Sequence, residues 1–269
     1  MDFKVGDYVT RKSYQSDVVF RIEKIENKNV FLRSFKLRLM ADSPVDDLIK
    51  IKDKDKKTIR KELLMESFEC IQRQQKHNIL NSKLVRTNKV ENSYIEYKIK
   101  VLHLDGDKDY LELSMSNYKN LNIEVEGFFI PEKGQPEEIT ELLTKIRPDI
   151  LVLTGHDGEL NNKSFHTSDY FVKSVEKARS IESDLDKLVI FAGACQSDYK
   201  RLIESGANFA SSPQNKLIHF LDPILVVEKI VFTSIREVLS VKDIINNTIT
   251  GRGGIGGVET RGKLRLQYP

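Results

Sequence analysis

The sequence predicts an α/β protein in which a parallel β-sheet carries helices on both faces, in three layers, after a small antiparallel β-barrel. From residue 97 onward, apolar runs of strand length alternate with helical stretches, which is the pattern of a parallel sheet. These runs are almost continuously aliphatic, which indicates strands buried on both faces. Before residue 53, shorter runs separated by turn residues indicate antiparallel strands instead.

Composition supports a folded protein with two unequal parts. The chain has 269 residues, of which 39% are hydrophobic and 31% charged, enough to bury a sizeable core. The net charge of +3 is too balanced to indicate nucleic acid or membrane binding, so we expect neither. Because no run is long enough to span a bilayer and the start, MDFK, lacks a signal peptide's apolar core, we expect a cytoplasmic protein.

Residues 1–52 are predicted to form the barrel. Short apolar runs at residues 8–10, 18–22 and 30–32 are separated by turn signals such as Gly6-Asp7. The opening FKVGDYVTRKSY resembles the first strand of an SH3-like barrel. Barrels of this kind usually bind or position a partner, so we expect no catalytic residue here.

Residues 53–96 are predicted to be a charged helical linker. Ile59, Leu63, Leu64 and Phe68 have helical spacing in an otherwise polar segment, which favours one amphipathic helix followed by a loop. Residues 50–61 carry seven Lys or Arg against two Asp, which is typical of a solvated linker.

Residues 97–269 are predicted to form the α/β domain. Strands are expected in KIKVLHLDGD, IEVEGFFIP, DILVLTGHDG, KLVIFAGAC and, more briefly, ANFASSP. Helices are expected at residues 108–119 and 136–146, around Tyr170, Val172, Val175 and Ala178, and from Pro223 onward. The segment GRGGIGG at residues 251–257 is interpreted as a loop, with a flap or a phosphate loop as alternatives; it lacks the Lys-Ser/Thr ending of a phosphate loop.

Chemistry is expected where the strands end, because sites in open parallel sheets form outside the carboxyl ends of strands. His156 ends one strand and Cys195 the next, so their side chains should emerge at the same edge of the sheet. A thiol just before a helix is activated by the helix dipole, which makes Cys195 a candidate nucleophile and His156 its base. The alternatives are a buried, inert cysteine and an ordinary polar strand end.

Backbone groups around this pair are expected to support the reaction. Gly155, Gly158 and Gly193 let the backbone approach a ligand closely, and amides near His156 and Cys195, with Asp157 as backbone support, could stabilise an oxyanion. We expect no metal, since two Asp in the DGD motif without a His pair are a weak ligand set. No cofactor is expected either.

The remaining histidines and cysteine receive structural interpretations. His103 lies inside a predicted strand and should pack in the core, whereas His166 and His219 lie in or beside loops. Cys70 is too far from Cys195 in sequence and surroundings to indicate a disulfide framework.

Several segments together resemble the YabG family of sporulation-specific peptidases from endospore-forming bacteria. The matching blocks are FKVGDYVTRKSY, LMADSPVDDL, VLHLDGD, PDILVLTGHD, LVIFAGACQS, GANFASSP and GGVETRGKLR. They run from the first residues almost to the last, which makes the resemblance far more specific than a short motif.

The resemblance implies a cysteine peptidase that acts on spore coat and related spore proteins in the mother cell, cleaving after Arg or Lys. The order of a His strand end before a Cys strand end is similar to the caspase, clostripain and gingipain group, which places the dyad at His156 and Cys195. That group commonly has Gly directly after His, whereas here Asp157 stands before Gly158.

A pocket for a basic residue requires a carboxylate. Asp198, Asp222 and Asp157 are candidates for it, and each could equally be a helix cap or a surface acid. Self-cleavage is expected as an accompaniment, with candidate sites at residues 50–61 and 73–76.

Two other functions remain open on the sequence. One is a non-catalytic scaffold that binds coat proteins, in which Cys195 only packs. The other is a flavodoxin-like nucleotide binder, which the missing phosphate loop disfavours. The sequence does not predict an oligomeric state.

Overall fold

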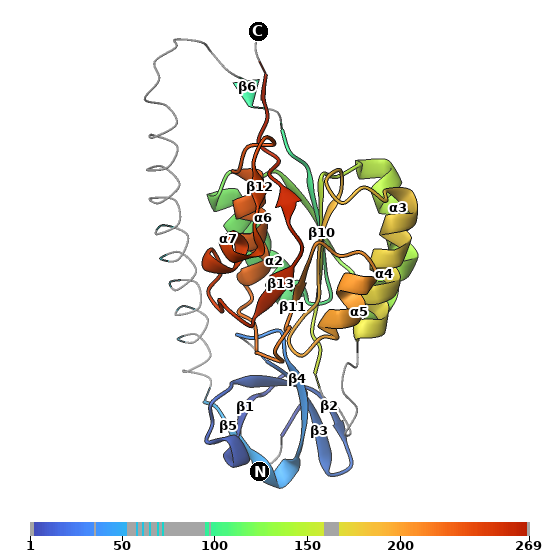
Figure 1. Ribbon diagram of the computed structural model, residues 1–269. Helices are drawn as coiled ribbons and strands as arrows, with labels where there is room; N and C mark the ends of the chain where they lie inside the picture. The colour runs from blue at the N-terminus through green and yellow to red at the C-terminus, as the bar shows by residue number, and fades with distance from the viewer. Residues whose placement is uncertain are drawn as a thin grey trace.

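The computed structural model describes residues 3–34, 36–52, 95–96, 98–158 and 167–267, together with single helical positions at residues 58, 61, 65, 69 and 72 (Figure 1). The expected amphipathic pattern at residues 59–68, Cys70, the self-cleavage candidates at residues 73–76 and His166 lie outside the described residues.

The N-terminal part is a five-stranded antiparallel sheet with the strand order β4-β3-β2-β1-β5. Its strands are β1 (Tyr8–Arg11), β2 (Phe20–Glu26), β3 (Asn29–Ser34), β4 (Met40–Pro44) and β5 (Leu48–Lys50), with short 3-10 turns at η1 (Lys12–Tyr14) and η2 (Val45–Asp47). Alternate residues such as Val30 and Leu32 are buried, which gives the sheet one apolar face. The predicted antiparallel strands are confirmed, and the narrower SH3-like comparison stays a prediction.

The C-terminal part is built on a six-stranded sheet with the order β13-β11-β10-β9-β7-β8. Its strands are β7 (Val101–Asp105), β8 (Val125–Phe129), β9 (Ile150–Thr154), β10 (Val189–Ala192), β11 (Phe209–Ser211) and β13 (Ile255–Gly257). Neighbouring strands are parallel except β13, which runs antiparallel to β11. The predicted parallel sheet is therefore confirmed.

Helices cover this sheet on both faces (Figure 1). They are α2 (Lys108–Asn120), η3 (Glu132–Gly134), α3 (Gln135–Ile146), α4 (Ser168–Ile181), α5 (Tyr199–Glu204), α6 (Asp222–Val231) and α7 (Val241–Asn246). One apolar core joins α3, α4 and α5 to one face, and a second joins α2 and α6 to the other. The three-layer arrangement agrees with the sequence, while the caspase-like or flavodoxin-like comparison stays a prediction.

Two small ribbons complete the described structure. They pair β6 (Ile95–Glu96) with β15 (Leu266–Gln267) and β12 (Val238–Leu239) with β14 (Thr260–Arg261). The proposed domain limits at residues 52 and 96 stay a prediction.

The glycine-rich tail differs from the prediction of a loop. Residues 251–254 form turns, but Ile255–Gly257 is strand β13 at the edge of the main sheet. A Cβ atom at Gly257 would lie 2.2 Å from the carbonyl oxygen of Asn208, so glycine allows the backbone to pack this closely. The glycines here permit strand pairing rather than mobility.

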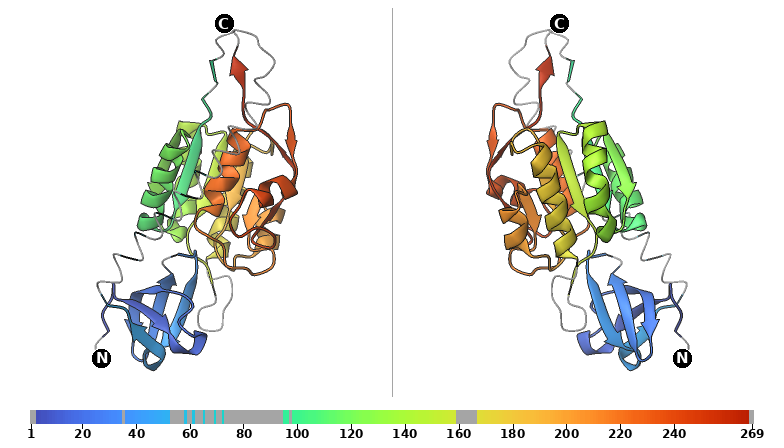
Figure 2. Two further views of the ribbon diagram at one scale, coloured as in Figure 1. Left: turned by 90° about the vertical axis from the view of Figure 1, so that its left-hand side faces the viewer. Right: turned by 90° about the vertical axis from the view of Figure 1, so that its right-hand side faces the viewer.

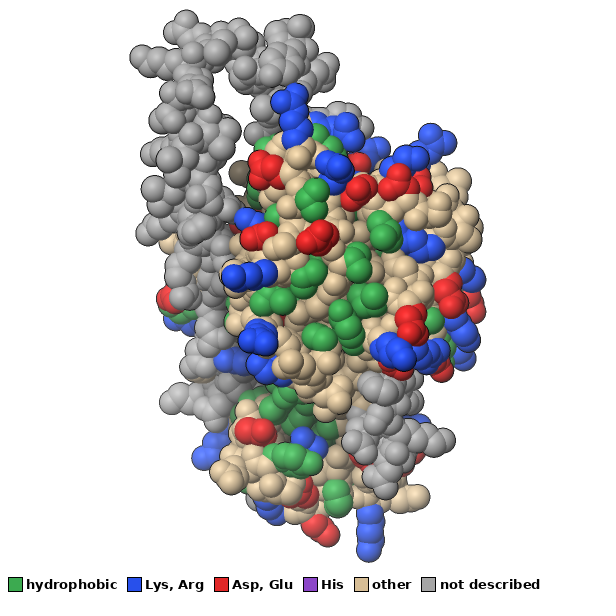
Figure 3. All heavy atoms as spheres, viewed as in Figure 1, with side chains coloured by type: hydrophobic (Ala, Val, Ile, Leu, Met, Phe, Trp, Pro, Cys, Tyr) green, Lys and Arg blue, Asp and Glu red, His purple; other side chains and the backbone are tan. Residues whose placement is uncertain are grey.

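The N-terminal sheet lies at the carboxyl ends of the parallel strands, below the α/β part in the views of Figures 1 and 2. The backbone of Met40 bonds to Asp157 in the loop after β9, which joins the two parts directly. On the face in Figure 3, Lys and Arg side chains are interspersed with Asp and Glu, and hydrophobic side chains lie between them. That face carries no large area of a single charge.

Candidate active site

His156 and Cys195 come from neighbouring strands at one edge of the sheet. β9 and β10 pair in parallel, with Leu153 opposite Ala192, so the loops that follow them start side by side. Both side chains are fully buried. The sequence-based expectation that the two residues follow adjacent strands matches this geometry.

The carbonyl oxygen of Arg38 lies between the two loops. It accepts hydrogen bonds from the backbone N–H of Cys195, at 3.0 Å, and from that of Asp157, at 3.3 Å. Two convergent amides around one carbonyl oxygen are the arrangement that stabilises the oxyanion of an acyl-transfer intermediate. The sequence predicted such donors near His156 and Cys195, and an oxyanion role for these two amides stays a prediction.

The Arg38 side chain fills a closed pocket. It is fully buried, its Nη1 lies 2.9 Å from Oδ2 of Asp105, and its guanidinium carbon lies 5.0 Å from the ring centre of Tyr110. Asp105 also accepts hydrogen bonds from Thr154 Oγ1, at 3.0 Å, and from the backbone N–H of Asp107, at 2.9 Å. Burial favours the neutral acid, but the Arg38 charge outweighs it and holds the pKa of Asp105 well below its usual range.

His156 is held by its backbone and by its ring. Its N–H donates to Glu132 Oε1 at 2.8 Å, and its ring stacks on Tyr110 with 5.2 Å between centres. Its Nδ1 lies 3.9 Å from Asp107 Oδ2. Burial, reinforced by the positive charges of Arg33 and then Arg38, places the pKa of His156 well below its ordinary value, so the ring is a neutral proton acceptor.

The Cys195 thiol differs from the dipole-activated thiolate that the sequence indicated. The helix after it, α5, begins only at Tyr199 with Asp198 as its N-cap, so Cys195 lies outside the first turn. Its Sγ accepts from the Ile218 N–H at 3.1 Å and lies 3.6 Å from the Ile218 carbonyl oxygen. Burial raises the pKa of Cys195 to about 12, so the enclosed thiol is protonated.

The Asp157 side chain ties the two loops together. Its carboxylate accepts from the N–H groups of Gly158 and Thr167, both at 2.9 Å, and from the hydroxyls of Ser168 and Ser197. Since Ser197 belongs to the Cys195 loop, these bonds fix the position of the His156 loop relative to the thiol. The carboxylate thus has a positioning role, while the backbone N–H faces Arg38.

Two further glycines shape the loops. Gly155 packs against the Glu132 carboxylate. Gly193 has a φ of +115°, and a Cβ atom there would lie 2.3 Å from Ser211 Oγ. The sharp turn that brings the Cys195 amide toward Arg38 therefore requires glycine at position 193.

The two acids considered for a basic-residue pocket have other partners. Asp198 accepts from the Arg201 N–H, at 3.2 Å, as the cap of α5. Asp222 is buried and accepts from the N–H groups of Ile249 and His219, at 2.8 and 3.2 Å. The carboxylate beside Arg38 is that of Asp105.

Sequence reasoning did not assign Arg38, Asp105, Tyr110 and Glu132 to the site. Asp105 has a usable signal, since it ends a predicted parallel strand, but the interpretations of the DGD motif are limited to a metal ligand set and a nucleotide site. The sequence carries no such signal for Arg38, because this residue reaches the site from the N-terminal part of the molecule. His103 is buried as expected, and its Nε2 lies 2.7 Å from Thr154 Oγ1 beside Asp105.

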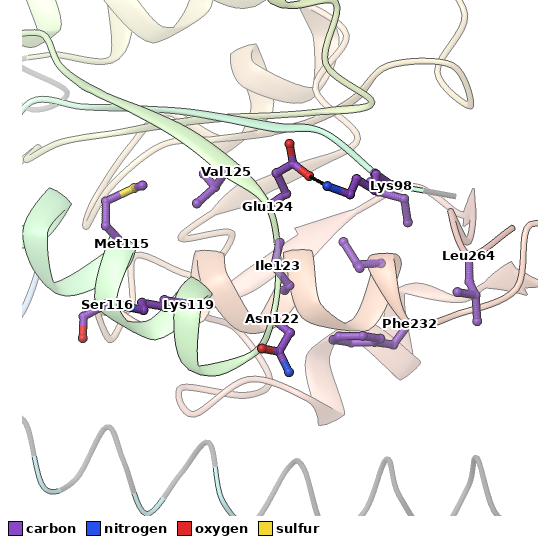
Figure 4. A pocket seen from close by; sticks show the side chains of 12 residues that line it. Lys98, Met115, Ser116, Lys119, Asn122, Ile123, Glu124, Val125, Phe232 and Leu264 are labelled. Atoms are coloured by element: carbon purple, nitrogen blue, oxygen red, sulfur yellow. Dashed lines mark ion pairs between the residues drawn. The ribbon is translucent and has the colours of Figure 1, made fainter. Parts of the chain in front are cut away.

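A groove of about 900 Å³ lies on the α/β part, away from the candidate active site (Figure 4). Its lining includes Met115 and Lys119 of α2, Val125 at the amino end of β8, and Phe232. It is therefore at the opposite end of the sheet from His156 and Cys195, and it contains neither of them.

No helix within the described residues is both long and apolar enough to span a bilayer. No cluster of three or more His, Cys, Asp or Glu in the same part of the chain has the arrangement of a metal site.

Comparison with known proteins identifies the family of the chain. The family model described as YabG peptidase U57 matches residues 4–269. The sporulation-specific protease YabG of Bacillus subtilis (strain 168) is 42% identical over 292 residues, which covers 100% of this chain and 99% of that protein. This chain therefore belongs to the YabG peptidase family.

Proposed function

We propose that the protein is a cysteine endopeptidase in which Cys195 is the nucleophile and His156 the general base and acid. One observation carries the proposal: a peptide carbonyl, that of Arg38, is bonded by the amides of Cys195 and Asp157 at the edge where both side chains lie. Membership of a peptidase family makes peptide hydrolysis the relevant reaction.

The chemistry follows from the neutral states of the two side chains. His156 accepts the thiol proton as sulfur attacks the carbonyl carbon, and the amides of Cys195 and Asp157 stabilise the oxyanion. The imidazolium then gives this proton to the leaving nitrogen, the C–N bond breaks, and a thioester forms. Water hydrolyses the thioester, which releases a carboxylate and restores the thiol. Asp107, 3.9 Å from His156 Nδ1, stabilises the transient imidazolium.

The pocket around Arg38 supports cleavage after a basic residue. Asp105 supplies the negative charge, and Tyr110 supplies an aromatic face for a cation. A planar guanidinium can use both, so arginine is preferred over lysine. We therefore propose Asp105, rather than Asp198 or Asp222, as the carboxylate of the specificity pocket.

The proposed biological role follows from the relative in Bacillus subtilis, whose name describes a sporulation-specific protease. We propose that this enzyme acts in the mother cell of a sporulating bacterium on proteins of the spore coat and related spore proteins. Self-cleavage accompanies this activity.

The test is hydrolysis of fluorogenic peptides by the wild type, Cys195→Ala and His156→Ala. The residue before the cleaved bond is Arg, Lys, Asp or Leu. The wild type should cleave the Arg peptide fastest, then the Lys peptide. Both variants should lose at least about 10³-fold in kcat/KM, because each removes one partner of the reacting pair.

The second cysteine supplies the matched control. Cys70→Ala should keep the wild-type rate, since the mechanism gives it no role. Turnover that survives Cys195→Ala would place the nucleophile elsewhere. Equal and negligible turnover in all proteins, with no self-processing, would instead favour a scaffold that binds coat proteins.

A further inference from the structure

Residues 36–39, between β3 and β4, lie in the candidate active site and are bridged to it through their backbone. Leu37 forms an antiparallel bridge with His219, and Leu39 forms a parallel bridge with Asp157. The Met40 N–H donates to the Asp157 carbonyl at 3.1 Å. Addition of an extended strand to exposed backbone groups is a common way for proteins to bind a peptide.

The floor of the site is shaped for this backbone. A Cβ atom at Gly158 would lie 2.3 Å from the Met40 carbonyl oxygen, so a larger residue would displace the segment. On the other side, the Tyr110 hydroxyl donates to the Leu37 carbonyl at 2.9 Å and to that of Ser34 at 3.1 Å. Contacts from the loop after β9 and from α2 therefore hold the segment in place.

The N-terminal sheet also prepares the loop for binding. The Ser34 N–H donates to the Leu39 carbonyl at 2.9 Å, which closes the loop at its base, and Arg33 pairs with Met40 where β3 meets β4. The loop is thus presented in a fixed shape, which reduces the entropy cost of placing it in the site.

We propose that this loop is the enzyme's own first substrate, cut between Arg38 and Leu39 by Cys195 of the same molecule. This inference rests on the proposed function and adds the bond that is cleaved. The Arg38 side chain occupies the Asp105 pocket, and its carbonyl oxygen occupies the oxyanion position, as required of the residue before a scissile bond.

The reaction balances with the groups at hand. The sulfur of Cys195 bonds to the carbonyl carbon of Arg38, the bond to the Leu39 nitrogen breaks, and the thiol proton reaches that nitrogen through His156. Water then converts the thioester into the Arg38 carboxylate and returns the thiol. The products are residues 1–38 and residues 39–269.

The same geometry restrains activity on other proteins. While the loop is in place, the oxyanion position and the pocket are filled by Arg38, so an external peptide must compete with a tethered one. The effective concentration of a tethered segment is high, in the millimolar range for short connections. External turnover should therefore be low in the uncut chain.

The test is intact mass under denaturing conditions, with N-terminal sequencing, for the full-length wild type and Cys195→Ala. The wild type should give the two products and a new N-terminus at Leu39, whereas Cys195→Ala should stay whole. The first-order rate constant of self-cleavage should not change over a hundredfold dilution of the protein, because the reaction is intramolecular. These measurements need no substitution in the loop.

Variants of two arginines in the N-terminal part then test the position. Arg38→Gln should stay uncut and should hydrolyse the Arg peptide faster than the uncut wild type, because its competing side chain binds the pocket weakly. The matched control Arg21→Gln, at a half-exposed arginine, should be cut like the wild type.

The outcomes separate this inference from the proposed function. A wild-type chain that stays whole, or is cut only elsewhere, while hydrolysing the Arg peptide through Cys195 would overturn the inference alone. Cutting that accelerates with concentration would overturn its intramolecular character. A chain with neither self-cleavage nor peptide turnover would overturn the proposed function as well.

Discussion

At the scale of single residues, the Asp105 carboxylate is oriented by the fold before any arginine reaches it. The Thr154 hydroxyl and the Asp107 N–H both donate to it, so its position depends on β7 and β9 rather than on Arg38. A carboxylate oriented by fixed donors is a preformed partner for a guanidinium, whose positive charge then holds the pKa of the acid low. The pocket should therefore discriminate by charge more than by shape.

This argument predicts the effect of Asp105→Asn on specificity. The substitution keeps the size of the side chain but leaves a bound guanidinium buried without its counter-charge, which costs about 3–5 kcal/mol. kcat/KM for the Arg peptide should fall about 10²- to 10³-fold, and that for the Leu peptide should change little. Asp198→Asn is the control, because Asn caps α5 as well as Asp does. An equal loss for both peptides would contradict a specificity role.

The buried thiol predicts an unusual pH dependence of alkylation. An acid whose pKa is raised stays protonated until the pH approaches that value, which for Cys195 is about 12. In Cys70→Ala/His156→Gln, which keeps the thiol but cannot cut itself, the iodoacetamide rate should rise about tenfold per pH unit between about pH 7 and 10.

Unfolding supplies the control for this profile. The same variant in concentrated urea should react along an ordinary curve that levels off above about pH 8.5, the usual thiol pKa. A folded-state rate that levels off below pH 8 would show that the thiol is neither buried nor neutral.

At the scale of elements, the sequence predicted best those helices and strands whose position depends on their own residues alone. The helix expected at residues 108–119 corresponds to α2 (Lys108–Asn120), and that at residues 136–146 to α3 (Gln135–Ile146). Aliphatic runs likewise located β9 and β10, because strands buried on both faces need little context to be recognised. The adjacency of His156 and Cys195 followed from this order.

Features that depend on contacts between distant elements were not predictable in the same way. The short helix α5 does not follow Cys195 directly, since it begins at Tyr199 with Asp198 as its cap. The glycine run at residues 251–257 forms a strand only because β11 offers an edge to pair with. The role of Asp105 depends on a side chain 67 positions earlier, for which periodicity carries no signal.

At the scale of the whole molecule, the N-terminal part supplies Arg38, and its sheet should stay paired after the proposed cleavage. The nick falls in the loop between β3 and β4, so the products keep complementary strands. The first fragment contains β1, β2 and β3, which pair with β5 and β4 of the second fragment. Backbone pairing and the shared apolar core should hold the two fragments together.

The nicked protein is therefore predicted to behave as one particle in native conditions and as two chains when denatured. Native gel filtration should give the elution volume of intact Cys195→Ala, while denaturing electrophoresis separates residues 1–38 from residues 39–269. Because unfolding now also separates two chains, the Tm of the nicked protein should rise with protein concentration, whereas that of intact Cys195→Ala should not. Loss of the short fragment during native gel filtration would instead mean that the Arg38 loop connection, rather than strand pairing, holds the sheet together.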